Sequence, residues 1–172
     1  MEVQMRVFQP VEPEEIESGA YVFDGSKMLV TSCDGDKVNT TAVSFGGVGQ
    51  MWGKRVTFVC VRKNRYTKEL IDASGVYSLS FLDNKEYHGA MKYLEMVSGK
   101  DEDKLKGARL HITYHDGVPF IEESSNAILC KVIYKNEIGK SGFVSPDIPE
   151  EFYKDENYHI IYVGEITKIL VR

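Results

Sequence analysis

The sequence predicts a mainly β fold, an antiparallel barrel with helices packed against its outside. Short apolar runs alternate with polar positions, and glycine- and aspartate-containing turns separate them. Helical spacing occurs in only two places, without the regular strand and helix alternation of a doubly wound sheet. The 172 residues, 42% of them hydrophobic, suit one domain over residues 1–172.

The N-terminal part contains hairpin signals. Residues 3–8 alternate and predict an edge strand, and the acidic stretch VEPEEIES after them predicts a loop or a short helix. Two short apolar runs, residues 19–23 and 28–32, are separated by the turn Asp24-Gly25. We therefore expect two paired strands here.

Residues 39–67 form the segment that the rest of the chain is expected to surround. Residues 41–45 predict a strand that breaks at Gly46-Gly47, where missing Cβ atoms would let a flat ligand approach a glycine-rich loop. Residues 56–61 are apolar on both faces, which predicts a buried strand.

Cations gather where this buried strand ends and a helix over residues 67–73 is expected to begin. They are Arg62, Lys63 and Arg65, followed by Tyr66 and Thr67. A helix N-terminus carries unpaired N–H groups and partial positive charge, so the segment favours an anion site. Arginines taken alone are more often surface cations at a strand end and helix start, but Tyr66, Thr67 and the expected helix start favour the anion site here.

The remainder predicts one more helix and several strands. Residues 77–82 alternate as a strand, and Asn84 is expected to cap a helix that ends at Ser98-Gly99. Composition favours a solvated turn for SGKDEDKL. Strands are then expected at residues 110–114, 118–121, 127–138 and 158–171, the last interrupted at Gly164-Glu165, with a long loop over residues 139–157.

Charge and cysteine usage exclude several classes of protein. A net charge of −5 argues against nucleic acid or an acidic membrane surface as the main partner. The three cysteines lack C-x-x-C spacing, and His111 and His115 do not share a helix face, so no disulfide framework or metal site is predicted. No apolar run of about 18 residues occurs, and we expect a reducing, cytoplasmic setting.

Four pieces of the chain, in order, resemble the flavin reductase-like family of FMN-binding split barrels, and within it the flavoredoxin-like branch. They are LVTSCDGDKVNTTAVSFGGVGQMW, VTFVCVRKNRYTKELIDASGVYSLSFL, MKYLEMVSGKDEDKL and YHIIYVGEI. The resemblance implies a six-stranded antiparallel Greek-key split barrel. It also implies a homodimer that holds FMN non-covalently near the subunit interface.

The resemblance assigns roles to individual residues. It implies that the strand from Asn39 to Ser44 lines the isoalloxazine ring and that RxxRYT grips the phosphate. Lys100 stands where the family motif SGRDxDK has arginine, and Lys54-Arg55 departs from relatives with proline at the second position. The implied cofactor-binding residues are Asn39, Thr40, Thr41, Ala42, Ser44, Trp52, Arg62, Arg65, Tyr66, Thr67, Ser98, Gly99 and Lys104, with His159 as the catalytic candidate.

For two of these residues, a purely structural role is the alternative to a functional one. Trp52 could pack at an interface instead of beside flavin. His159 could pair with backbone instead of serving as a proton relay or nicotinamide contact.

The function implied is an NAD(P)H-dependent flavin oxidoreductase that transfers hydride from nicotinamide to flavin. A flavoredoxin-like FMN electron carrier that exchanges electrons with a protein partner is the second reading. A non-redox barrel with an empty site is the third. FAD remains open as the flavin if residues 142–157 leave room for its adenylate.

Overall fold

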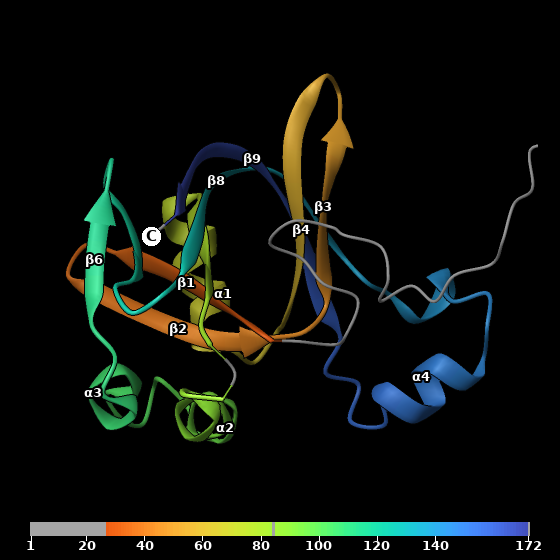
Figure 1. The fold of residues 1–172 in the computed structure, drawn as a ribbon. Coiled ribbons are helices and arrows are strands. Elements are labelled where there is room, and N and C mark those ends of the chain that lie inside the picture. The colour runs from red at the N-terminus through yellow and green to blue at the C-terminus, as the bar shows by residue number, and fades with distance from the viewer. Residues whose placement is uncertain (1–26, 84, 172) are drawn as a thin grey trace, which may run out of the picture.

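The computed structural model describes residues 27–83 and 85–171. Seven strands form one antiparallel sheet in the order β2-β1-β5-β8-β9-β4-β3, which curls into a barrel (Figure 1). Its strands are β1 (Met28–Asp34), β2 (Lys37–Val43), β3 (Gly46–Met51), β4 (Lys54–Arg62), β5 (Val76–Phe81), β8 (Asn126–Glu137) and β9 (His159–Val171). The predicted mainly β split-barrel class is confirmed.

The connection between β2 and β3 is hydrogen-bonded to β4, which lies near the other end of the strand order. The backbone N–H of Cys60 in β4 donates to the carbonyl oxygen of Phe45, at 3.1 Å. Strands β2, β1, β5, β8, β9 and β4 wrap the core, while β3 extends the edge beside β4. A second sheet, β6 (Ile112–His115) with β7 (Val118–Ile121), packs on β5, where the Ser78 hydroxyl donates to the carbonyl of Pro119 at 2.6 Å.

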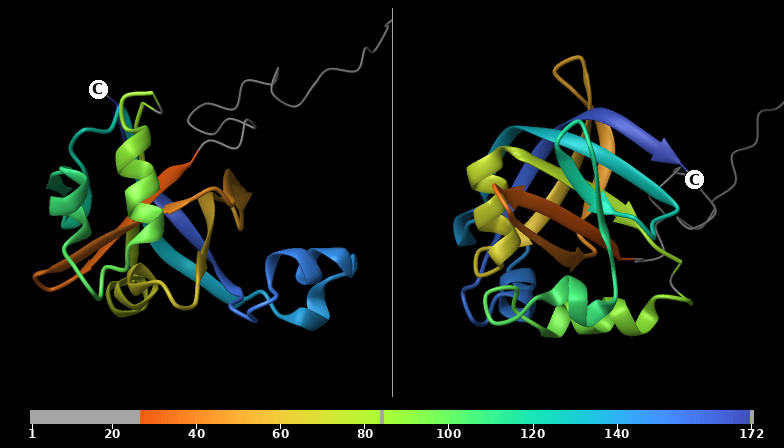
Figure 2. Two further views of the ribbon diagram at one scale, coloured as in Figure 1. Left: turned by 90° about the horizontal axis from the view of Figure 1, so that it is seen from below. Right: turned by 90° about the vertical axis from the view of Figure 1, so that its left-hand side faces the viewer.

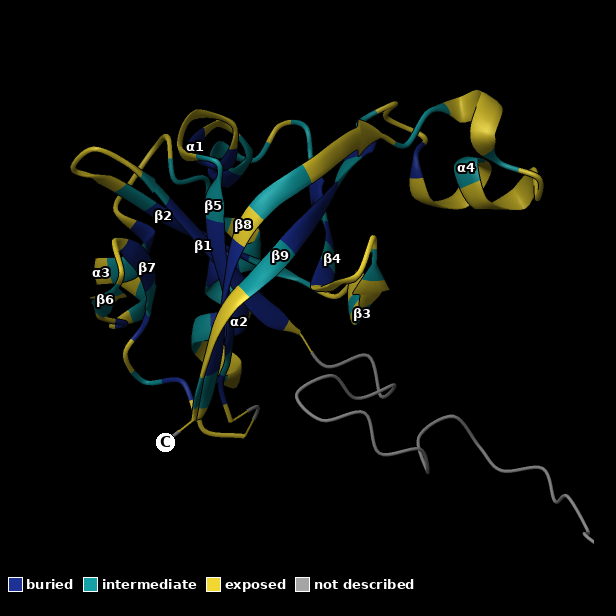
Figure 3. Cartoon of the chain, turned by 90° about the horizontal axis from the view of Figure 1, so that it is seen from above, coloured by how far each residue is buried: buried dark blue, intermediate teal, exposed yellow. Residues whose placement is uncertain are grey.

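Alternation along β1 builds the two hydrophobic cores. Val30 faces the barrel interior with Val59, Leu79 and Tyr162, whereas its neighbour Leu29 faces the opposite side. Because successive strand residues point to opposite faces, one apolar run supplies both cores. Figure 3 shows the buried centre of the sheet and the exposed β3 and α4.

In the described part of the chain, four α-helices lie outside the barrel: α1 (Tyr66–Ser74), α2 (His88–Met96), α3 (Lys104–Ala108) and α4 (Asp147–Phe152). The helices α2 and α3 lie together at one end (Figure 2). The helix α4, with the 3-10 turn Lys140–Gly142, protrudes on the other side between β8 and β9.

Several sequence expectations need correction. Gly46-Gly47 does not open a loop but begins β3, and the turn lies at Trp52 and Gly53, whose positive φ angles of 51° and 71° suit a tight hairpin. The loop predicted over residues 139–157 contains α4. Strand β9 is continuous through Gly164, and the β8–β9 register shifts between Leu129 and Cys130 and between Val132 and Tyr134.

The strands predicted at residues 3–8 and 19–23, the stretch VEPEEIES, the turn at 24–25 and the cap at Asn84 lie outside the described residues. The second helix begins at His88, where Tyr87 occupies the N-cap position without a side-chain cap.

Candidate functional site

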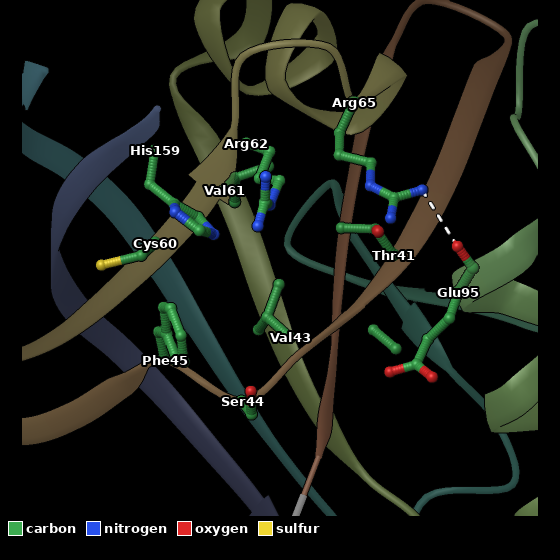
Figure 4. Close-up of a pocket in the computed structure, with 11 residues that line it drawn as sticks. Thr41, Val43, Ser44, Phe45, Cys60, Val61, Arg62, Arg65, Glu95 and His159 are labelled. Carbon is green, nitrogen blue, oxygen red and sulfur yellow. Dashed lines mark hydrogen bonds between the residues drawn. The ribbon is translucent and has the colours of Figure 1, made fainter. Parts of the chain in front are cut away.

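Two adjacent cavities share Thr41 and Arg65. We call the first the strand cavity, about 190 Å³, and Figure 4 shows its lining side chains. It is lined by residues 41–45 and 60–62 with Arg65, Glu95 and His159. We call the second the helix cavity, about 160 Å³; it is lined by Asn39, Thr41, Asn64, Arg65, Tyr66, Met96, Val97, Ser98, Gly99 and Lys104.

The N-terminus of α1 forms one wall of the helix cavity. The N-cap residue is Arg65, which makes no side-chain capping hydrogen bond, and Tyr66 and Thr67 are the first two helical residues. The first backbone N–H groups of a helix have no intrahelical partner and carry partial positive charge. This end of α1 is therefore suited to an anion.

A hydrogen-bonded cluster fixes the floor of the helix cavity. The Asn39 amide donates to the Thr67 hydroxyl at 2.8 Å, and both residues are buried. A Cβ on Gly99 would lie 2.1 Å from the Asn39 Oδ1, so only glycine allows this approach. The neighbouring Ser98 hydroxyl accepts from the Lys100 backbone N–H at 3.2 Å.

Lys104 is buried, with 2% of its surface exposed, and this corrects the predicted solvated turn. The turn itself is exposed over residues 100–103, but Lys104 begins α3 and its ammonium donates to the Thr40 carbonyl at 3.1 Å. Burial, with a smaller contribution from the charge of Arg65, lowers the pKa of Lys104 to about 8. Arg65 itself donates to the Glu95 carbonyl at 3.1 Å.

The strand cavity holds a second set of polar groups. Arg62 donates to the carbonyls of Phe152 at 3.2 Å and Asn157 at 3.4 Å, so it ties the α4 segment to β4. His159 lies beside Phe45, with 5.2 Å between ring centroids. Burial, and then the charges of Arg62 and Arg65, lower the pKa of His159 to about 4.

Thr41 stands between the two cavities with an unsatisfied hydroxyl. Its Oγ1 is the one fully buried side-chain nitrogen or oxygen that lacks a partner in the described part of the chain. Buried polar groups without partners are rare, and a bound water, ion or ligand that supplies the partner is one explanation for them. The adjacent Thr40 differs, because its hydroxyl donates to the Val30 carbonyl at 3.1 Å and accepts from Thr31 at 3.0 Å.

The structure brings most of the predicted residues together, with exceptions. Ala42, Ser44, Arg62 and His159 line the strand cavity but not the helix cavity. Arg62 still adjoins the start of α1, because its carbonyl accepts from the backbone N–H of Arg65, the N-cap residue, at 3.0 Å. Thr40 lines neither cavity, but its carbonyl accepts the hydrogen bond from the Lys104 ammonium. Trp52 lines neither cavity: it is 62% exposed at the β3–β4 turn, with its ring centroid 6.0 Å from that of Tyr134.

Sequence reasoning missed several residues of the site. Asn64 lines the helix cavity beside Arg65, and the Glu95 carbonyl of α2 accepts from Arg65 at the start of α1. No local sequence pattern indicates this contact. Tyr153, which contacts His159, comes from the segment predicted to be a loop. Phe45 lay within the predicted strand, and its position next to Ser44 was the available signal.

Two structural features are absent from the described residues. Within 27–83 and 85–171, no three or more histidine, cysteine, aspartate or glutamate side chains gather as ligands for a metal ion. Over the same residues, no helix has the length and apolar character needed to cross a membrane.

Solved structures of similar fold come from archaea and bacteria. A flavoredoxin from Methanosarcina acetivorans is 21% identical with a TM-score of 0.68, over 94% of this chain and 76% of that one. An FMN-binding protein from Thermus thermophilus, solved with p-hydroxybenzaldehyde, is 20% identical with a TM-score of 0.66, over 98% and 82%. An NADH:FAD oxidoreductase from Streptomyces globisporus is 14% identical with a TM-score of 0.64, over 85% and 75%.

No curated protein matches the sequence. Residues 22–172 match the family described as "Flavin reductase like domain". The match covers most of the chain and agrees with the split-barrel fold. This chain is therefore a member of the flavin reductase-like family.

Proposed function

We propose that this protein binds FMN non-covalently and acts as an NAD(P)H-dependent flavin reductase. The observation that carries the proposal is the buried, unpartnered Thr41 hydroxyl between two cavities that both contain Arg65. A ligand that spans both cavities would give this hydroxyl its missing partner. FMN has the required two parts, a planar polar ring and a phosphate, so the residues present fit it.

The helix cavity suits the phosphate. Arg65 and Lys104 provide two cations, and the start of α1 provides backbone N–H groups. Asn39 and Gly99 act indirectly, because they fix the position of Thr67. In this proposal Arg62, which lies outside the helix cavity, supports the ring side instead of the phosphate.

The strand cavity suits the ring. Residues 41–44 offer backbone and hydroxyl groups along one side, and Phe45 and His159 form the other. Bound FMN would supply the hydride-accepting chemistry, which no protein side chain provides. The protein's own residues orient the ring and, through Arg62 and Arg65, place positive charge near it.

Membership of a family described as flavin reductase-like supports NAD(P)H as the electron donor. An electron carrier without nicotinamide is the second candidate. Exposed apolar side chains near the strand cavity favour it, because they could meet a redox partner protein: Phe45 is 41%, Ile148 39% and Phe152 44% exposed. A homodimer would use similar exposed surfaces, and we propose it as the assembly.

An absorbance experiment separates these functions. Purified protein is mixed with FMN, desalted, and treated with NADH and then NADPH without oxygen. We expect flavin bands that survive desalting and bleach with one of the two donors. Bands that survive both donors would replace the reductase with the electron carrier.

A protein that retains no flavin is then assayed for NAD(P)H oxidation with free FMN. Turnover would identify an exchangeable flavin substrate. No turnover would reject flavin chemistry and leave a barrel with a non-redox role. Repeating the desalting step with FAD tests which flavin the cavities accept.

A further inference from the structure

Tyr153 and His159 form a buried pair on the α4 side of the strand cavity. Tyr153 is the C-cap residue of α4, and His159 is the first residue of β9. The phenol oxygen lies 2.7 Å from the histidine Nδ1, and the two side chains are 6% and 7% exposed. Tyr158 stacks on the Tyr153 ring with 4.7 Å between centroids, so the phenol is held in place.

The direction of this hydrogen bond follows from the charge state of the two groups. Burial and the cations Arg62 and Arg65 lower the pKa of His159 to about 4, so the ring is neutral near pH 7. Burial raises the pKa of Tyr153, so its hydroxyl keeps its proton. A neutral imidazole has one N–H and one acceptor nitrogen, and the tautomer is set by the bond at the other nitrogen.

The Tyr153 hydroxyl needs an acceptor for its proton. Among the described residues, Nδ1 of His159 is the hydrogen-bond partner found for this hydroxyl. If Nδ1 carried the proton, the phenol O–H would remain buried without an acceptor, which costs about 1–3 kcal/mol. The phenol therefore donates to Nδ1, and the imidazole proton belongs on Nε2.

We infer that Tyr153 is a positioning residue that fixes the Nε2–H tautomer of His159, so that this histidine presents a neutral N–H donor to a ligand in the strand cavity. The ring of His159 reaches between Cys60 and Arg62 toward Phe45 (Figure 4). Because two Arg62 hydrogen bonds already go to the α4 segment, His159 is the directed donor on this wall.

This arrangement selects a ligand by its acceptor atoms. A carbonyl oxygen, a ring nitrogen with a lone pair or an anionic oxygen would pair with Nε2–H, whereas an ammonium group would be repelled by Arg62 and Arg65. The application to FMN rests on the proposed function, but the tautomer does not. The role also differs from a proton relay, because a histidine with a pKa near 4 carries no transferable second proton at neutral pH.

The test is ¹⁵N NMR of the histidine side chains in flavin-free protein, with His159→Gln used to assign the signals. We expect Nδ1 of His159 to have the shift of an unprotonated nitrogen and Nε2 that of a protonated one. Both should stay unchanged between about pH 8 and about pH 5, where an ordinary histidine titrates. An Nδ1–H tautomer, or titration near the ordinary value, overturns the inference even if no variant is made.

The variant Tyr153→Phe removes the hydroxyl and keeps the ring, and Tyr158→Phe is its matched control in the same aromatic stack. We expect Tyr153→Phe to bring the two nitrogen shifts of His159 closer together, as a mixture of tautomers does, and Tyr158→Phe to leave them unchanged. An unshifted His159 in Tyr153→Phe contradicts the positioning role.

Flavin titration supplies a separate result. Tyr153→Phe should weaken FMN and riboflavin equally, by about two- to tenfold, the size of one neutral hydrogen bond. A loss restricted to FMN would contradict action at the ring. If wild-type protein binds neither flavin, the proposed function fails while the NMR result still decides the tautomer.

Discussion

The two cavities differ in how many hydrogen bonds and ion pairs their cations already make within the protein. In the strand cavity, Arg62 bonds two carbonyl groups of the α4 segment and lies 3.5 Å from a carboxylate oxygen of Asp155. In the helix cavity, Lys104 and Arg65 each donate to one backbone carbonyl in the described structure. Lys104 is also buried, and a nearby anion would reduce the free-energy cost of burying its charged ammonium. The proposed anion site therefore depends on which donors remain available and not on the number of cations.

The largest expected effect comes from the floor of the helix cavity, which has no counterpart in the strand cavity. In Gly99→Ala the new Cβ must displace the Asn39 side chain, 2.1 Å away, and so disturb its bond to Thr67. We expect FMN affinity to fall by about a hundredfold, equivalent to about 2.7 kcal/mol, measured by fluorescence titration.

Gly89→Ala is the matched control, because its Cβ would meet nothing within 4 Å on α2. It should leave FMN binding unchanged and raise helix stability by about 0.5–1 kcal/mol. If Gly99→Ala also binds FMN normally, Asn39 and Thr67 do not shape the phosphate site.

The arginines test the comparison directly. Arg65→Ala should weaken FMN by roughly ten- to a hundredfold and riboflavin much less, because a charge-assisted bond contributes about 1.5–3 kcal/mol and only FMN has the phosphate. Arg62→Ala should affect both flavins alike and loosen the α4 segment, which hydrogen exchange would detect at residues 147–157. If Arg62→Ala instead weakened FMN much more than riboflavin, Arg62 would bind the phosphate, as the RxxRYT motif predicts.

The sequence predicted those parts of the fold and site that depend on local pattern. The alternation in residues 77–82 and the cations ahead of α1 are both visible in adjacent residues. The sequence therefore predicted β5 and the N-terminus of α1. The burial of Lys104 depends on the carbonyl of Thr40, 64 residues earlier, and composition around it indicated solvent. Arg62 and Arg65 both line the strand cavity, but their side chains bond to different segments, Arg62 to the carbonyl of Phe152 in α4 and Arg65 to the carbonyl of Glu95 in α2. Their shared motif does not indicate this difference.

A pair of neighbouring threonines tests the unpartnered hydroxyl. Thr41→Val removes a buried hydroxyl without a partner, so the flavin-free protein should be equally or more stable, while FMN affinity falls by about tenfold. Thr40→Val removes two hydrogen bonds and should cost about 1–3 kcal/mol of unfolding free energy in a urea titration. Equal destabilisation by both variants would show that Thr41 is already satisfied by the protein.

The smallest effect near neutral pH concerns the charge of Lys104. Raising the pH is expected to change folding stability and FMN affinity in opposite directions. Burial lowers the folded-state pKa from 10.5 to about 8. Between these values the unfolded chain binds more protons, so the contribution of Lys104 to stability rises with pH across that window and is flat below it. FMN binding should respond oppositely, because the phosphate favours the ammonium form and its own second ionisation, near pH 6, is complete.

Affinity for FMN should therefore fall above about pH 8, by at most about tenfold per pH unit, while riboflavin affinity changes little. Lys104→Met should remove both trends, since methionine fills the same space without a charge. If the FMN affinity of wild-type protein is flat from about pH 7 to about pH 10, Lys104 lies outside the phosphate site despite its burial in the helix cavity. Opposite slopes for stability and FMN affinity, both absent in Lys104→Met, would mean that a charge unfavourable for folding is retained because it binds the ligand.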